Sequence, residues 1–325
     1  GPEELMKQKL SRQSENISLV AVIVVLFIIF TILQPNMMTL FNIKNILVQV
    51  SLTAIAAAGM TFAYTAGVFD MSVGSILALI SVVVAKVATT AGVVPAIGAA
   101  FLIAVVVGIL NGMIVTKLGI QAFAATLVTM ILIRGIAVLM ADGADVPLYS
   151  VNAIKFISSG TILGIPFPII LTVLVYAASY FLYYKTEFGM KIRSVGSNGD
   201  ASRISGIRTD RMITAAFVLT AVTAVFSSLI KTAQVMFGKA TIGEDFALDV
   251  MTTVILGGTV ITGGKGNLTG TLIASVLIAV IKNGLNINNV NSYYQQLAIG
   301  IILIFALVFN GMKSMKNARQ IRREG

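Results

Sequence analysis

The sequence predicts an all-α, polytopic membrane protein with about ten transmembrane helices and both termini in the cytoplasm. Hydrophobic residues make up 57% of the 325 residues and charged residues only 11%, less than half the charged share of an ordinary soluble domain. Apolar runs of about 20 residues, the length of helix that crosses a bilayer, recur along the chain. Basic residues collect in three segments that one topology places on the same side of the membrane.

The apolar runs divide the chain into ten expected spans. The first run begins at Ile17 and is too long for the core of a signal peptide, so we expect it to remain as a membrane helix. The expected organisation is a cytoplasmic segment over 1–16, a transmembrane domain over 17–312 and a cytoplasmic basic tail over 313–325. The ten expected spans are 17–34, 43–66, 72–90, 94–116, 121–140, 166–184, 211–233, 246–262, 268–285 and 294–312.

The basic residues set the orientation, because cytoplasmic loops carry an excess of Lys and Arg. They cluster before the first span, in the loop over 185–210 after the sixth span, and behind the last span. An even number of spans separates these clusters, so all three lie on the cytoplasmic side. The same count places two acidic pairs, Asp142 with Asp145 and Glu244 with Asp245, on the outer side.

The composition excludes several kinds of function. The chain contains no His and no Cys, and so lacks the usual ligands of zinc and haem and the thiol nucleophiles. We therefore expect neither a metal site nor catalytic residues on this chain. Its net charge of +10 fits the positive-inside rule better than a nucleic-acid partner.

The stretch LGGTVITGGKGNLTG over 256–270 looks like a phosphate-binding loop, but its spacing rejects that function. Such a loop reads G-x-x-x-x-G-K-[ST]. Here Thr259 stands where the first glycine belongs, and Gly266 follows Lys265 in place of Ser or Thr. We expect a cytoplasmic glycine-rich turn in which Asn267 or Thr269 caps the next helix; it either borders a pathway or simply connects two helices.

A second break, TAGVFDMSVGS over 65–75, places Asp70 between two apolar spans. Acidic residues in or near a membrane usually have a functional or a capping role. Asp70 or Ser72 would accept hydrogen bonds from the amides that open the next helix, or would take part directly in transport. The sequence leaves open whether the break at 67–71 lies at the cytoplasmic face or inside the membrane.

The cytoplasmic loop contains a predicted short helix. The residues GDASRISG over 199–206 follow a cap at Asn198 or Asp200 and end at Gly206. One interpretation of a short helix with glycine at both ends, held in the longest cytoplasmic loop, is an element that docks onto a partner protein. A solvated basic linker is the alternative.

Five segments carry a family resemblance. They are TAGVFDMSVGSILAL (65–79), LNGMIVTKLGIQAFAATL (110–127), GMKIRSVGSNGDASRISGI (189–207), GEDFALDVMTTVILGGTVITGGKGNLTGTL (243–272) and KNGLNINNVNSYYQQLAIG (282–300). Together and in this order they resemble the permease subunit of bacterial ABC importers for monosaccharides such as ribose, xylose, arabinose and galactose. The family usually has GIDLS where this chain has VFDMS at 68–72.

The resemblance implies a multi-pass protein of the bacterial inner membrane that translocates a monosaccharide delivered by a periplasmic sugar-binding protein. It implies a dimer with a second permease copy, identical or related, and a separate cytoplasmic ABC ATPase. ATP and magnesium would bind to that ATPase, so this chain is a transport subunit and not an enzyme, with no cofactor of its own. Closure of the ATPase dimer would move the cytoplasmic loop and open the path by rigid-body movement of helices.

Three sets of residues follow as candidate sites. The set for coupling to the ATPase is Gly196, Asn198, Ala201, Arg203, Ser205 and Gly206. The set for the translocation path is Asp70, Ser72, Asn111, Gln121, Thr126, Gln234, Asp249, Thr252 and Asn283. The set for docking of the binding protein is Asp142, Asp145, Tyr149, Lys239, Glu244 and Asp245.

Two alternatives remain at this point. A related ABC permease would carry a nucleoside, a polyol, an autoinducer or a branched-chain amino acid instead of a sugar. An ion-coupled secondary transporter would need intramembrane carboxylates, for which Asp70 and Asp249 are the only candidates.

Overall fold

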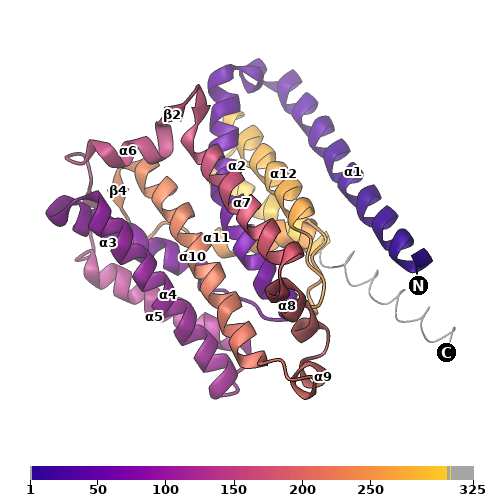
Figure 1. Ribbon diagram of the computed structural model, residues 1–325. Helices are drawn as coiled ribbons and strands as arrows, with labels where there is room; N and C mark the ends of the chain where they lie inside the picture. Colours follow the sequence, from indigo (N-terminus) through magenta and orange to yellow (C-terminus); the bar gives the residue numbers. More distant parts are fainter. Residues whose placement is uncertain (1, 306–307, 309–325) are drawn as a thin grey trace.

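The computed structural model describes residues 2–305 and 308, and this part of the chain is almost entirely helical (Figure 1). Eight of its helices are long and apolar enough to cross a membrane, and two shorter apolar helices occupy the remaining two expected spans. The prediction of an all-α polytopic fold is confirmed. The predicted basic tail over 313–325 lies outside the described residues, as does most of the last expected span beyond Phe305.

The helices coincide with the expected spans to within a few residues at most ends. In chain order the elements are α1 (Pro2–Leu33), η1 (Pro35–Met38), α2 (Leu40–Thr65), α3 (Val73–Ala91), α4 (Val93–Lys117), α5 (Ala122–Met140), β1 (Val146–Pro147), α6 (Asn152–Ser159), β2 (Thr161–Ile162), β3 (Ile165–Pro166), α7 (Phe167–Lys185), α8 (Glu187–Ser197), α9 (Gly199–Ile204), α10 (Thr209–Val235), β4 (Phe237–Gly238), α11 (Phe246–Leu256), α12 (Leu268–Ile287) and a last helix over Ser292–Phe305.

The two ends of the bundle differ in the way the charge pattern predicts. The amino terminus of α1 lies at the same end as α8 and α9, whereas α6 and β2 lie at the opposite end (Figure 1). The basic residues in the first turns of α1 and those after α7 therefore share one end, which we treat as the cytoplasmic end.

Helix α2 forms the centre of the bundle. It packs against α7, α10, α11 and α12, and nearly all its residues beyond Val50 are buried. Helices α3, α10 and α12 bury most of their residues, whereas α1, α4, α5 and α7 expose broad apolar faces. In a membrane such faces contact lipid, so the peripheral helices shield a central group.

Glycines let the central helices approach closely. A Cβ on Gly59 of α2 would lie 2.1 Å from Thr223 Oγ1 of α10, and one on Gly108 of α4 would lie 2.6 Å from the Cα of Val218. Without a hydrophobic drive between helices in lipid, such close backbone contact supplies much of the packing attraction.

The chain between α10 and α11 folds back into the bundle. Gly238 lies against Ser81 and Ala85 of α3, and Gly243 lies against Gly74 at the start of the same helix. Residues 238–243 therefore run alongside α3 for roughly 10 Å, at a rise of 1.5 Å per helical residue. Irregular backbone at this depth is tolerated because it is covered by protein.

Helix α11 completes this crossing but is shorter than predicted. The expected span over 246–262 is helical only as far as Leu256, and its 11 residues extend about 16 Å, half of a bilayer core. The helix ends where two glycines begin, and Gly258 adopts a φ of +83°, a conformation that other residues rarely adopt. The folded-back segment and α11 together replace one full span, which preserves the predicted parity.

Candidate functional site

The predicted short helix of the cytoplasmic loop is present as α9. The Asn198 side chain caps it by accepting a hydrogen bond from the Ala201 amide at 2.9 Å, and Gly206 follows the helix with a φ of +83°. The preceding α8 is stabilised on its surface by the ion pair of Glu187 with Lys191 at 2.7 Å. The hydrogen bond and charge of Lys191 lower the pKa of the Glu187 carboxyl below its ordinary value.

Helix α9 presents an exposed tip. Ala201, Arg203, Ser205 and Gly206, all from the predicted coupling set, are exposed on it. The tip also carries Ile204, whose side chain is 89% exposed and which the sequence reasoning missed. Its place inside the predicted short helix over 199–206 was the available signal.

Gly196 differs from the rest of the coupling set because it lies in a packed junction. A Cβ at Gly196 would lie 1.8 Å from the Thr65 carbonyl oxygen and 2.6 Å from the Gly264 nitrogen. The Gly264 amide in turn donates a hydrogen bond to the Thr65 carbonyl at 2.8 Å. The end of α8, the end of α2 and the glycine-rich turn therefore meet at one point.

Tyr183 makes α7 the fourth element of this junction, beside α8, α2 and the glycine-rich turn. Its hydroxyl oxygen accepts a hydrogen bond from the Gly266 amide at 2.7 Å and lies 3.2 Å from Thr65 Oγ1. Its ring packs edge-on against Phe62 and beneath the guanidinium of Arg193. Asn267, as predicted, caps the next helix by accepting from the Gly270 amide at 3.0 Å. We call Thr65, Tyr183, Gly196, Gly264 and Gly266 the inner junction.

The break between α2 and α3 extends inward past the cytoplasmic end of α4. Asn111 donates a hydrogen bond to Ser72 Oγ at 2.9 Å, and Asn111 lies six residues before the end of α4 at Lys117. At 1.5 Å per residue this places Ser72 about 9 Å inside that end. The break therefore begins at Gly67 beside Gly196 of α8 and ends at Ser72, inward of the cytoplasmic end of α4.

Asp70 is buried in this break, and the capping prediction is wrong. Its Oδ1 accepts hydrogen bonds from the amide of Ser72 at 2.9 Å and from the Ser72 hydroxyl at 2.5 Å. Ser72 is the first residue flanking α3, and neither side chain reaches the helix amides beyond it. The reason is geometric: Asp70 closes a two-residue turn onto Ser72. Asp70 Oδ2 and Asn111 Oδ1 are left without hydrogen-bond partners in the described structure.

Thr126 of α5 joins the same cluster by accepting from the Met71 amide at 3.1 Å. Four of the predicted path residues, Asp70, Ser72, Asn111 and Thr126, therefore lie together. Thr252 is buried and bonds to a carbonyl of its own helix. Gln121 and Gln234 are exposed near opposite ends of the bundle and join neither this cluster nor each other.

A second polar cluster joins α2, α11 and α12. Asp249 forms an ion pair with Lys282, and Asn283 exchanges two hydrogen bonds with Asn42 at 2.9 and 3.0 Å. Lys282 lies five residues before the end of α12 at Ile287, about 8 Å along the helix. Charged residues at such depth are retained when they pair or face water. The sequence reasoning named Asp249 and Asn283 but missed Lys282, although a lysine inside an apolar span is itself a signal.

The folded-back segment is held by Arg134 of α5, which the sequence reasoning also missed. Its guanidinium donates hydrogen bonds to the carbonyl oxygens of Ala240 and Ile242, the latter at 2.8 Å. Backbone carbonyls that have left a helix need such donors within a membrane.

At the outer end, four of the predicted docking residues gather on one surface. Strands β1 and β4 pair, Asp145 forms an ion pair with Lys239 at 2.7 Å, and the Tyr149 ring packs on Phe237. Asp142 bonds to Lys86 of α3 at 2.9 Å. Glu244 and Asp245 do not join them; both are exposed beyond Gly243, and Asp245 accepts a hydrogen bond from Gln296.

Comparisons with known proteins agree with this architecture. Residues 42–307 match the family described as "Branched-chain amino acid transport system / permease component". The chain is 35% identical over 313 residues to the ribose import permease protein RbsC of Escherichia coli K12, with 95% of each chain covered.

It is 37% identical over 299 residues to the ribose import permease protein RbsC of Bacillus subtilis, covering 89% of this chain and 91% of the relative. It is 32% identical over 297 residues to the D-allose transport system permease protein AlsC of E. coli K12, with 90% of each chain covered. No solved structure gives a significant match. The chain therefore belongs to this family of transport-system permease components.

Proposed function

We propose that this chain is the membrane-spanning subunit of an ABC importer for a monosaccharide, driven by a separate cytoplasmic ATPase. The observation that carries the proposal is the similarity to ribose import permeases over nearly the whole chain, at 35% identity with 95% of both chains covered. The predicted resemblance to monosaccharide permeases rests on segments spread over the same region. A branched-chain amino acid is the second candidate cargo, favoured only by the name of the family.

The proposed coupling element is α9 with its exposed tip. The ATPase would hold Ile204 and its exposed neighbours, and α8 would carry the displacement to the inner junction. Gly196 contacts both Thr65 and Gly264. A displacement of α8 would therefore displace α2 and the α11–α12 connection together. Close-packed elements transmit such displacements as rigid-body shifts.

The proposed path runs beside the two polar clusters, between this chain and a second permease copy. An uncharged sugar needs hydrogen-bond donors and acceptors and no fixed counter-charge. Within the clusters, the acceptor oxygens Asp70 Oδ2 and Asn111 Oδ1 have no partner in the described structure, whereas the amides of Asn42 and Asn283 bond to each other. On the outer side, the surface of Asp142, Asp145, Tyr149 and Lys239 is the proposed contact for the periplasmic binding protein.

Reconstitution tests this function. The chain would be placed in proteoliposomes with an ABC ATPase and a sugar-binding protein, and uptake of labelled ribose would be compared with uptake of leucine. We expect ribose uptake that requires ATP, the ATPase and the binding protein. Uptake driven by a proton or sodium gradient without ATP would contradict the proposal. ATP-driven uptake of leucine but not of ribose would show that the cargo is a branched-chain amino acid.

A further inference from the structure

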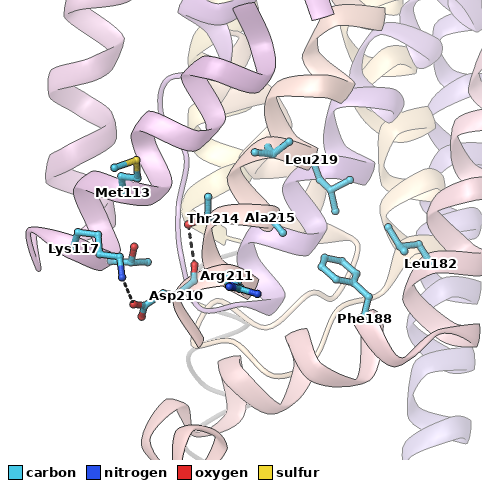
Figure 2. Close-up of a pocket in the computed structure, with 11 residues that line it drawn as sticks. Met113, Lys117, Leu182, Phe188, Asp210, Arg211, Thr214, Ala215 and Leu219 are labelled. Atoms are coloured by element: carbon cyan, nitrogen blue, oxygen red, sulfur yellow. Dashed lines mark hydrogen bonds and ion pairs between the residues drawn. The ribbon is translucent and has the colours of Figure 1, made fainter. Parts of the chain in front are cut away.

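A groove on the outside of the bundle lies between α4 on one side and α7 with α8 on the other, with α10 as its floor. Figure 2 shows Met113 and Lys117 on the α4 side and Leu182 with Phe188 facing them across α10. Its volume is about 580 Å³. We call this the α4–α7 groove.

The floor of the groove is apolar and lies at membrane depth. Ala215, Val218 and Leu219 of α10 line it and are only partly covered by neighbouring helices. Val218 is seven residues beyond Arg211, about 10 Å along the helix. Since α4, α7 and α10 all have the length and hydropathy of membrane spans, the groove opens toward the acyl chains of the cytoplasmic leaflet.

The cytoplasmic rim of the groove carries surplus positive charge. Asp210 pairs with Lys117 at 3.1 Å and lies 3.7 Å from Arg203, so one carboxylate serves two cations. The neighbouring Arg211 is exposed and forms no ion pair with any residue in the described part of the chain. A phosphate placed here would meet two cations. The Arg211 guanidinium has no ion-pair partner in the described part of the chain, and the Lys117 ammonium shares the Asp210 carboxylate with Arg203.

We infer that the α4–α7 groove binds an anionic phospholipid of the cytoplasmic leaflet, with its phosphate between Lys117 and Arg211 and one acyl chain along Ala215, Val218 and Leu219. The basic rim complements the phosphate, and the apolar floor complements the chain. A sugar is a poor occupant because Ala215, Val218 and Leu219 offer it no side-chain hydrogen bonds. The inference goes beyond the transport function and does not depend on the cargo.

The absence of tryptophan from the sequence allows a direct test. Phe188→Trp places one fluorescent reporter on the wall of the groove, and the purified full chain is reconstituted with brominated phosphatidylglycerol or brominated phosphatidylcholine. We expect phosphatidylglycerol to quench the reporter at lower mole fraction. The preference should be roughly fivefold for each basic residue that contacts the phosphate.

Two variants in the reporter background complete the test. Lys117→Gln combined with Arg211→Gln should reduce phosphatidylglycerol to the level of phosphatidylcholine, whereas Lys155→Gln, an exposed lysine of α6 at the outer end, should change nothing. Ala215→Phe should fill the floor and weaken quenching by both lipids. Equal quenching by both lipids in the parent, or a preference that survives the double substitution, would overturn the inference. Absence of quenching by either lipid would also overturn it, because a second copy of the chain would then cover the groove.

Discussion

Gly196 and Thr65 are 131 positions apart in the sequence, yet the backbone of Thr65 leaves no room for a side chain at position 196. A Cβ at Gly196 would lie 1.8 Å from the Thr65 carbonyl oxygen, far inside van der Waals contact. The same carbonyl accepts the hydrogen bond of the Gly264 amide at 2.8 Å. The cytoplasmic loop is thus fixed to the central helix and to the glycine-rich turn by backbone contact.

Gly196→Ala is expected to destabilise the inner junction and impair coupled transport. The clashing atoms belong to backbone, which moves less easily than a side chain, so we expect a loss of about 1–3 kcal/mol. The thermal midpoint of the purified chain and ATP-driven uptake would both be measured. Gly199→Ala is the matched control, because a Cβ there meets no atom within 4 Å. Equal behaviour of the two variants would refute the packing argument.

Tyr183→Phe is expected to weaken the same junction without a clash. The substitution leaves the buried Gly266 amide without its acceptor at 2.7 Å, and such a loss costs about 1–3 kcal/mol. Tyr180→Phe, three residues earlier on α7, removes an exposed hydroxyl and should leave the thermal midpoint unchanged. A smaller shift for Tyr183→Phe than for Tyr180→Phe would argue against the hydrogen bond.

The sequence predicted the helices better than their mutual contacts. Hydropathy and basic clusters located the spans, and capping chemistry located α9 and the Asn267 cap, because these signals are local. The role of Gly196 depends on Thr65 and Gly264, which no local pattern connects to it. Residues 238–243 have the composition of an ordinary loop, and their place beside α3 depends on glycine contacts and on Arg134 from a distant helix.

Ile204→Ser is expected to reduce ATPase binding without unfolding the chain. Ile204 is 89% exposed, so its loss removes no internal packing. Burial of an isoleucine at an interface contributes about 1.5–3 kcal/mol, which corresponds to roughly tenfold or more in affinity. Co-purification and binding of the ATPase would be measured. Leu163→Ser, an equally exposed residue at the outer end, should leave ATPase binding intact.

Asp70 variants separate a structural role from a role in transport. No Lys or Arg in the described part of the chain pairs with Asp70, so the fold needs its acceptor oxygen more than its charge. We expect Asp70→Asn to keep stability within about 1 kcal/mol, because an amide oxygen still accepts from the Ser72 amide, and Asp70→Ala to lose about 1–3 kcal/mol. Full uptake by Asp70→Asn would exclude a requirement for the carboxylate, whereas a stable but inactive variant would establish one.

The ion pair of Asp249 with Lys282 predicts a particular pattern in a double-mutant cycle. Asp249 is buried and Lys282 is 32% exposed at the side chain, so removal of either partner leaves a charge at membrane depth. Asp249→Asn and Lys282→Gln should each lower stability by about 1–3 kcal/mol, less than for a fully buried pair because Lys282 reaches solvent or a partner. The double variant should be more stable than either single variant, because it leaves neither member of the pair without its partner. Thermal midpoints of the four proteins would give the coupling free energy, and additive losses would show that the two side chains act independently.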